Sequence, residues 1–220
     1  MTNDELAELL ATHPTLYHMA ERGSWPHIRA HGLLSTTALL DLYKVSGEKR
    51  LEVEERHRPN KMPISSPDLP NAVVRDQIPM SDGGLVRCLP PHMAPSDWYK
   101  ILNSKVFFWL RRERLVTMLK ADAYREDAHD VLEVNSQALV DVYRDRLWLS
   151  PMNTGCTKPY PHPRDEQTFS RIPDYPYGRR PKRERAVELA IDYAVPDIEK
   201  FVKRVVEMRR ETEIRIIYSG

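Results

Sequence analysis

A few side chains, widely separated along this chain of 220 residues, are of the types that do chemistry on small molecules. Glu188 lies in the mainly apolar run 187–191. A carboxylate can stabilise the positive charge that develops when a glycosidic bond breaks, and it can help to deprotonate an incoming nucleophile. Tyr17 and His18 form an adjacent pair in another apolar run. An exposed strand face for Glu188 and ordinary packing for the pair are the alternatives.

Arg75 and an aromatic segment suit the binding of a ligand. Arg75 lies near the end of a predicted strand, and its guanidinium fork matches two oxygens of a phosphate. The alternative is a surface pair with Asp76. Residues 105–110 have strand character, and the alternation of a strand places Phe107 and Trp109 on the same face. That face can stack on a flat ring, although a core strand explains it equally well.

The elements that must position these groups begin with residues 16–43. Their pattern predicts a strand, a turn, a helix, a glycine stop and a second helix. Ser24 can cap the first helix, which has Pro26 in its first turn. Gly32 supplies the left-handed backbone that ends this helix. The Tyr17-His18 pair is therefore expected on a strand that leads directly into the turn and the helix.

Apolar periodicity and capping residues predict the remaining elements. Helices are expected over 4–12, 95–103, 113–121 and 136–143. Strands are expected over 71–77, 85–89, 105–110, 130–134, 146–149, 186–191 and 214–218. A further helix is expected to start at Val195-Pro196 and to contain Phe201 and Val206. The charged run 45–59 is expected to be a helix face or a loop in solvent.

Residues 150–185 form the longest stretch without a regular pattern, and their prolines exclude a sustained helix or a central strand. A loop of this length within a domain is usually functional or disordered. The tyrosines and basic residues considered in it are Tyr160, Tyr175, Tyr177, Arg164, Arg171, Arg179, Arg180, Lys182, Arg183 and Arg185. Such side chains can bind a nucleic-acid strand or an anionic nucleotide by stacking and charge neutralisation. A mobile, solvated loop is the alternative.

Composition favours a single domain over residues 1–220, because 41% of the residues are hydrophobic and can form one core. The net charge of +1 excludes a global positive field for nucleic acid, so any basic patch must be local. Cys88 and Cys156 are far apart and lack the spacing of metal ligands. We therefore expect no disulfide framework and no metal, and a reducing compartment fits best.

The first residues of the chain are acidic, and they lack the basic lead and the long apolar run of a signal peptide. No stretch reaches the roughly 18 apolar residues of a membrane span. We therefore expect a soluble, cytoplasmic protein that does not bind membranes.

The opening of the chain resembles that of ADP-ribosyltransferase-fold proteins. The match consists of Tyr17-His18, followed by Ile28 and by His31-Gly32-Leu33-Leu34-Ser35. It is closest to the DarT-like group and more distant from the RNA 2′-phosphotransferases. The resemblance implies that His18 contacts the ribose of NAD, and that the Gly32-Leu33 turn closes the wall of the pocket.

Two later segments extend the resemblance in the order expected for the family. Val187-Glu188-Leu189-Ala190-Ile191, followed by Val195-Pro196, is similar to the late strand that carries the catalytic glutamate of DarT-like proteins. The aromatic run 107–109 is similar to their second core strand, which implies that Phe107 or Trp109 packs the nicotinamide. The family's Asn-Pro-Arg element is not found after this run, where residues 111–114 read Arg-Arg-Glu-Arg. No arginine is therefore assigned a catalytic role.

The resemblance implies an α+β fold with a split antiparallel sheet of the ADP-ribosyltransferase type and NAD in the cleft. Glu188 would carry catalysis. The residues expected to contact NAD or line its pocket are Tyr17, His18, Arg75, Phe107, Trp109 and Asn153. Asn153 belongs to a polar turn with Gly155, which resembles the turn that lines the family's substrate side. The loop 150–185 would then face the substrate.

The acceptor of ADP-ribose would be a base of DNA or RNA, a protein side chain or water. Water as the acceptor would make the protein an NAD glycohydrolase. A 2′-phosphotransferase on the same fold is a further possibility, for which Arg75 is the only indication. A non-enzymatic module that binds nucleic acid or protein is the alternative outside enzymes. A role as a toxin, in defence or in biosynthesis stays open.

Overall fold

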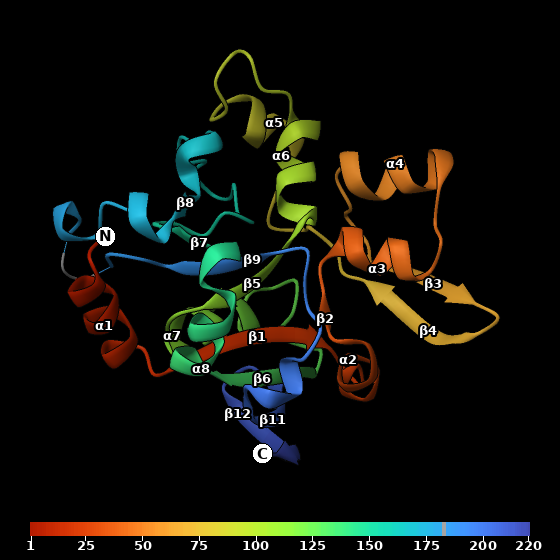
Figure 1. Cartoon of the computed structure of the whole chain (residues 1–220). Helices are drawn as coiled ribbons and strands as arrows, with labels where there is room; N and C mark the ends of the chain where they lie inside the picture. Colours follow the sequence, from red (N-terminus) through yellow and green to blue (C-terminus); the bar gives the residue numbers. More distant parts are fainter. Residues whose placement is uncertain (182–183) are drawn as a thin grey trace.

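The computed structural model describes residues 1–181 and 184–220. Its centre is an eight-stranded sheet in which every neighbouring pair is antiparallel, in the order β12-β11-β6-β1-β5-β9-β7-β8 (Figure 1). The strands are β1 (Thr15–Glu21), β5 (Lys105–Trp109), β6 (His129–Asn135), β7 (Leu147–Ser150), β8 (Ser170–Arg171), β9 (Glu188–Asp192), β11 (Val202–Arg209) and β12 (Thr212–Ser219). The predicted class, an α+β protein with a large antiparallel sheet, is confirmed.

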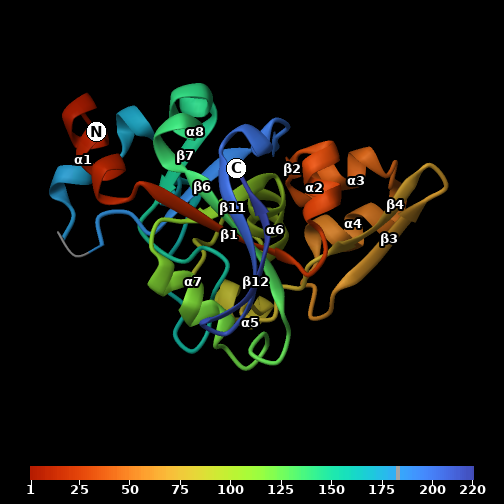
Figure 2. The ribbon, with the colours of Figure 1, turned by 90° about the horizontal axis from the view of Figure 1, so that it is seen from below.

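Helices cover both faces of this sheet, and two short ladders complete the fold. The helices are α1 (Asn3–Thr12), α2 (Trp25–His31), α3 (Thr36–Leu42), α4 (Gly47–Glu55), α5 (Asp82–Val86), α6 (Pro95–Asn103), α7 (Arg112–Leu119) and α8 (Ser136–Tyr143). The ladders pair β2 (Leu33–Leu34) with β10 (Ala194–Val195), and β3 (Met62–Ser66) with β4 (Leu69–Val74). Figures 1 and 2 show α3, α4 and the β3–β4 hairpin as a lobe opposite α1.

The two central strands, β1 and β5, are joined at only one position. Tyr17 is paired with Trp109, and the remaining residues of the two strands are not in register with one another. In contrast, β1 pairs with β6 from Thr15 to Glu21, and β5 pairs with β9 along its whole length. The sheet is therefore split between β1 and β5 into two half-sheets, each held by its own ladder. Backbone groups that face the split are left for side chains or for a ligand.

The core lies on both faces of the sheet, as alternation along a strand requires. On one face, helices α1, α2 and α8 bury apolar side chains against strand residues such as Leu16, Phe108 and Leu132. On the other face, Leu115 and Leu119 of α7 pack with Val131 of β6 and its neighbours. Full burial of one such side chain contributes about 1.5–3 kcal/mol to folding. These two layers hold β1, β5 and β9 in place at the split.

Gly32 is one position where glycine is required. Its φ angle is +86°, and a Cβ atom built on it would lie 2.5 Å from the Cα of Pro196. The prediction that Gly32 ends a helix in left-handed backbone is confirmed, because α2 stops at His31. This close approach lets β2 pair with β10, immediately after α2.

The strand expected over 85–89 is wrong, because α5 covers Asp82–Val86. The Oγ of Ser81 accepts a hydrogen bond of 3.1 Å from the amide of Gly84 and so caps the helix. The cap outweighs the strand preference of Leu85 and Val86, and the side chain of Val86 is exposed. Propensity alone favoured the wrong element here.

The helix expected from Pro196 to Val206 is also wrong. A short 3-10 turn covers Ile198–Lys200, and β11 follows as a strand between β6 and β12. The spacing of Val202, Val205 and Val206 imitates a helix. However, Val205 and Val206 are both buried, one in each layer of the core, because β11 is covered on both faces. A central strand that is buried on both sides reads as a continuous apolar run.

The stretch 150–185 is irregular, as predicted, but much of it is packed on the domain. Arg164, Tyr175 and Tyr177 are buried, so the prediction that they form a nucleic-acid contact is wrong for these three. Tyr160 is exposed. Lys182 and Arg183, which belong to the same prediction, lie outside the described residues.

Other basic residues of this stretch also form ion pairs or cation–π contacts within the fold. Arg171 pairs with Asp192, at 2.8 Å, and its guanidinium lies 3.8 Å from the centre of the Trp148 ring. Arg185 pairs with Glu8, and the guanidinium of Arg180 lies over the Tyr175 ring. The tyrosines and arginines of the stretch therefore serve packing first. The alternative prediction of a mobile, solvated loop is also wrong for these packed side chains.

Candidate functional site

A cavity of about 610 Å³ opens where β1 and β5 diverge. This volume lies within the range of about 300–1,000 Å³ that small-molecule sites occupy. The residues expected to carry catalysis or to contact NAD all contribute to its wall, namely Tyr17, His18, Arg75, Phe107, Trp109, Asn153 and Glu188. The fold therefore brings together groups that lie far apart along the chain.

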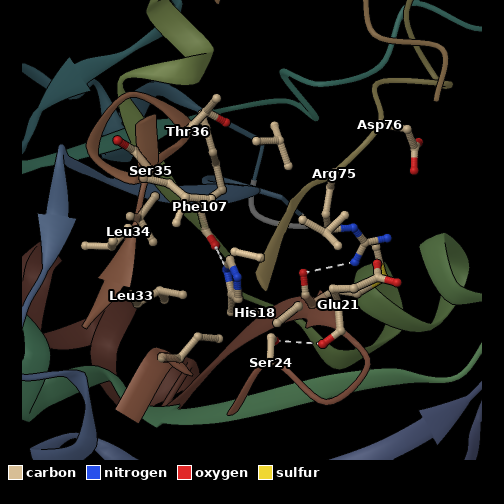
Figure 3. Close-up of a pocket in the computed structure, with 18 of the residues that line it drawn as sticks. His18, Glu21, Ser24, Leu33, Leu34, Ser35, Thr36, Arg75, Asp76 and Phe107 are labelled. Atoms are coloured by element: carbon tan, nitrogen blue, oxygen red, sulfur yellow. Dashed lines mark hydrogen bonds between the residues drawn. The ribbon is translucent and has the colours of Figure 1, made fainter. Parts of the chain in front are cut away.

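His18 bridges the split. Its Nδ1 lies 2.8 Å from the carbonyl oxygen of Phe107 on the opposite strand, a contact that Figure 3 shows as a dashed line. A carbonyl only accepts hydrogen bonds, so Nδ1 must carry the proton and donate it. Burial lowers the pKa of His18 to about 4, and the imidazole is therefore neutral at physiological pH. The other ring nitrogen, Nε2, is consequently a hydrogen-bond acceptor.

Glu188 begins β9, opposite Trp109 of β5 and Ser150 of β7. The residue is only 4% exposed, so the alternative of an exposed strand face is wrong. The backbone amide and the hydroxyl of Thr154 both donate to its Oε2, at 3.1 and 2.6 Å. Both bonds go to one oxygen, and Oε1 takes no part in them.

The ionisation of Glu188 is balanced close to neutral pH. Burial raises the pKa of this carboxyl to about 7, while the hydrogen bonds from Thr154 and the charges of Arg164 and Arg114 act in the opposite direction. A carboxyl with such a pKa, on the wall of a cavity, is a common sign of a functional group. A cationic ligand beside it would favour the charged form.

Arg75 follows β4 and reaches across to β1. Its Nη1 donates to the carbonyl of Met19 at 3.3 Å, and its guanidinium lies 5.3 Å from the centre of the Tyr124 ring. The surface pair with Asp76 is not formed, since Asp76 accepts instead from the hydroxyl of Tyr124. Nη2 of Arg75 is buried and has no hydrogen-bond partner among the described residues. Arg75 can therefore donate to an anionic group in the cavity.

The aromatic residues of the site belong to two different clusters. Phe107 packs beside Phe169, with ring centres 6.0 Å apart. Trp109 and Tyr17 pack against the cluster around Leu115 of α7. All three line the cavity while they are supported from behind, so they present firm apolar walls. Core packing is thus shown for these residues, and because they also line the cavity, stacking on a ligand ring stays a prediction.

Asn153 belongs to the turn that holds Glu188. Its Oδ1 accepts from the amide of Gly155 at 3.1 Å, which shapes the turn 153–155 around Thr154. Thr154, whose two bonds hold the carboxylate, was not selected from the sequence as a site residue. A hydroxyl in an irregular proline-rich stretch gives no signal of its own, since its partner lies in a strand much later in the chain.

Arg58 is a second group that sequence patterns do not reveal. It lies in the charged run expected in solvent, and most of α4 in that run is indeed exposed. Arg58 itself is buried, donates to the backbone carbonyl of Arg75 at 3.2 Å and to Asn103 at 2.9 Å, and lines the cavity. It fixes the backbone from which Arg75 extends.

Other cations of the wall are already paired with carboxylates. Lys105 lies 2.6 Å from Asp192, and Arg22 lies 2.8 Å from Glu207. Within residues 1–181 and 184–220, no group of three or more His, Cys, Asp and Glu side chains could hold a metal ion. In the same residues, no helix is long and apolar enough to cross a membrane.

Comparison with known proteins identifies the family of the chain. No curated protein and no solved structure matches it. The profile of a family of unknown function, DUF7002, matches residues 14–202. This range starts just before β1 and ends at the start of β11, and it contains all the cavity residues named above. The chain therefore belongs to the DUF7002 family.

Proposed function

We propose that the protein is an NAD-dependent ADP-ribosyltransferase. It would cleave the bond between nicotinamide and ribose and transfer ADP-ribose to a nucleic-acid base or another acceptor. The observation that carries the proposal is that His18 and Glu188, from opposite half-sheets, line one cavity at the split between β1 and β5. The resemblance to DarT-like proteins implies that His18 orients the ribose and that Glu188 is the catalytic carboxylate.

His18 is suited to orient the ribose. Because its Nδ1 is committed to the Phe107 carbonyl, Nε2 can accept a hydrogen bond from a ribose hydroxyl. The low pKa of about 4 keeps the ring neutral, so this acceptor is not lost by protonation near pH 7. A neutral ring also avoids repulsion with the positive charge that develops on the ribose.

Glu188 is suited to stabilise that charge. Cleavage breaks the bond between the ribose carbon and the ring nitrogen of nicotinamide, whose electron pair leaves with the nicotinamide as a neutral molecule. The ribose carbon becomes electron-poor, and a carboxylate beside it stabilises the transition state. The acceptor then forms the new bond, and Glu188 can take the proton that the acceptor gives up. A single carboxylate suffices for these roles.

The remaining walls suit the rest of the dinucleotide. Phe107 and Trp109 provide apolar surfaces on which the nicotinamide ring can pack. The unpartnered Nη2 of Arg75 can donate to a phosphate oxygen, which adds a charge-assisted bond. A cytoplasmic location is part of the proposal, because both cysteines are free thiols, as a reducing compartment maintains them.

The test is the release of nicotinamide from NAD by the purified chain. Release is measured by chromatography, alone and with single-stranded DNA, duplex DNA, RNA or a protein mixture, and the acceptors are examined by mass spectrometry for added ADP-ribose. Glu188→Gln should abolish most of the release. Glu166→Gln, which removes an exposed carboxylate paired with His92, serves as the matched control. No release from any mixture by the folded protein would favour a non-enzymatic binding module.

A further inference from the structure

Arg164 lies behind the cavity and is only 3% exposed. Its three nitrogens donate to backbone carbonyls: Nη1 to Thr154 at 2.9 Å, Nη2 to Cys156 at 2.8 Å and Nε to His162 at 3.1 Å. The guanidinium also lies 5.5 Å from the centre of the Trp98 ring, and the indole of Trp98 donates to the same Thr154 carbonyl at 3.3 Å. One side chain therefore holds the whole turn 154–156 in place.

The charge of Arg164 is unusual because it is buried without a paired carboxylate. Among the described residues, no Asp or Glu side chain forms an ion pair with Arg164. A buried cation is costly unless a negative charge lies nearby. The acid that is linked to it is Glu188, since Arg164 donates to the carbonyl of Thr154, and the amide and hydroxyl of Thr154 donate to Glu188. Burial lowers the pKa of Arg164, and Cys88, Cys156 and Glu188 oppose that change, in this order of size.

We infer that Arg164 is a positioning residue for Glu188: it fixes the turn whose Thr154 holds the carboxylate, and its buried charge favours the ionised form. This inference rests on the proposed function only for its catalytic meaning. The sequence predicts that the proline-rich stretch 150–185 faces the substrate. The inference adds that the same stretch supports Glu188 from behind the cavity.

The other charged and titratable groups around this pair differ from Arg164. Arg114 of α7 also acts on Glu188, but it is paired with Glu184 and is about two-fifths exposed. His18 shares the cavity and is neutral. Cys88 and Cys156 lie beside Arg164 rather than Glu188. Arg164 is thus the cation whose effect on Glu188 should be least screened by water.

The experiment measures the pKa of the Glu188 carboxyl by NMR titration of carbon-13-labelled glutamate, without NAD. Arg164→Gln should raise this pKa by roughly one unit, the effect of losing a nearby opposite charge. Arg164→Lys keeps the charge but loses the fork that bonds the turn, so it should raise this pKa by less than Arg164→Gln does. Arg114→Gln removes one charge from the same surroundings and should shift the pKa by less than half as much as Arg164→Gln.

Two results would overturn the inference. The first is an unchanged pKa of Glu188 in folded Arg164→Gln. The second is a pKa shift in Arg114→Gln that equals the shift in Arg164→Gln, because the pKa would then depend on the net charge nearby and not on Arg164 in particular. If Arg164→Gln does not fold, Arg164→Lys decides, because an unchanged pKa of Glu188 in this folded variant contradicts the positioning role of the guanidinium.

The pH profile of nicotinamide release separates this inference from the proposed function. If the wild type releases nicotinamide, the lower inflection of the profile should move upward in Arg164→Gln, and by less than half as much in Arg114→Gln. A pKa shift by NMR in a protein that releases no nicotinamide would preserve the positioning role and reject the proposed function. If nicotinamide is released but the inflection is the same in Arg164→Gln as in the wild type, the proposed function is preserved and the positioning role is rejected.

Discussion

The two half-sheets hold their functional side chains in different ways. In the half-sheet β12-β11-β6-β1, His18 is oriented by one backbone carbonyl directly across the split. In the half-sheet β5-β9-β7-β8, Glu188 is held by Thr154, which is itself held by Arg164. The imidazole thus depends on the geometry of two strands, whereas the carboxylate depends on a long irregular segment that packs from behind.

Burial acts on both groups and drives each toward its neutral form. It lowers the pKa of His18 to about 4 and raises that of Glu188 to about 7. For the histidine the result is a permanent acceptor, which is the state that the proposed function needs. For the glutamate the result is a compromise, because the proposed function needs the charged state. Under that proposal, the same desolvation helps one half of the site and must be offset in the other.

The largest effect is expected from removing the carboxylate. Glu188→Gln should reduce nicotinamide release by about 10²–10³-fold, the usual loss when one group that stabilises transition-state charge is removed. Kinetic assays with saturating NAD measure this loss. Retention of full activity in the folded variant would exclude Glu188 as the catalytic group.

The pH dependence of the reaction should report Glu188 and not His18. With this pKa of about 7, the ionised fraction of Glu188 falls from about one half at pH 7 to about one hundredth at pH 5, so release at low NAD should fall by about 50-fold over this range. His18, with a pKa of about 4, should add no inflection near 6.5. Initial rates between pH 5 and 9 test both statements. An inflection near 6.5 that survives in Glu188→Gln would point to a charged His18.

Glu188 should also link stability to pH. Its pKa is about 7 in the folded protein, against 4.5 for the ordinary carboxyl, so the folded chain holds this proton more tightly. The resulting stabilisation is complete below pH 4.5 and is lost as the pH rises through 7. Glu188→Gln should therefore gain roughly 3 kcal/mol relative to the wild type between pH 4 and pH 8. Urea unfolding at the two pH values measures the difference, and an equal difference at both would contradict the raised pKa.

Removal of the imidazole should lower the stability of the fold, by a smaller amount and for a different reason. His18→Ala leaves the Phe107 carbonyl without its partner at the split, and we expect a loss of about 1–3 kcal/mol in the free energy of unfolding. His18→Gln can restore a donor to this carbonyl and serves as the comparison. If both variants unfold like the wild type, the contact across the split does not stabilise the protein.

The smallest effect on stability is expected at an ion pair between β11 and β6, in the half-sheet that contains His18. Arg204 of β11 forms two bonds with Glu133 of β6, at 2.8 and 2.7 Å, but the pair is partly exposed. Arg204→Gln should cost no more than about 1 kcal/mol in stability, because water screens such pairs. Nicotinamide release should not change. A large loss of activity would show that this ion pair acts on the cavity residues of its own half-sheet, through Tyr17, which lies opposite Glu133.

Sequence analysis identified the features that depend on neighbouring residues and missed the side chains that are held by distant segments. Tyr17-His18, the glycine that ends α2 and the aromatic strand β5 were identified because each depends on neighbours along the chain. Glu188 was selected because its strand is similar to the late strand of DarT-like proteins. Thr154 and Arg58 were not selected, and Arg164 was predicted to contact nucleic acid, because a buried polar side chain in such a segment has the same sequence pattern as an exposed one. Their partners are set by packing between distant segments, which periodicity does not report.

The pairing of β1 and β5 at Tyr17 and Trp109 alone has a thermodynamic consequence. A dinucleotide that touched His18 on one strand and Glu188 on the other would cross-link two bodies that the backbone barely connects. Its binding energy would add to folding, so the melting temperature should climb steadily with dinucleotide concentration.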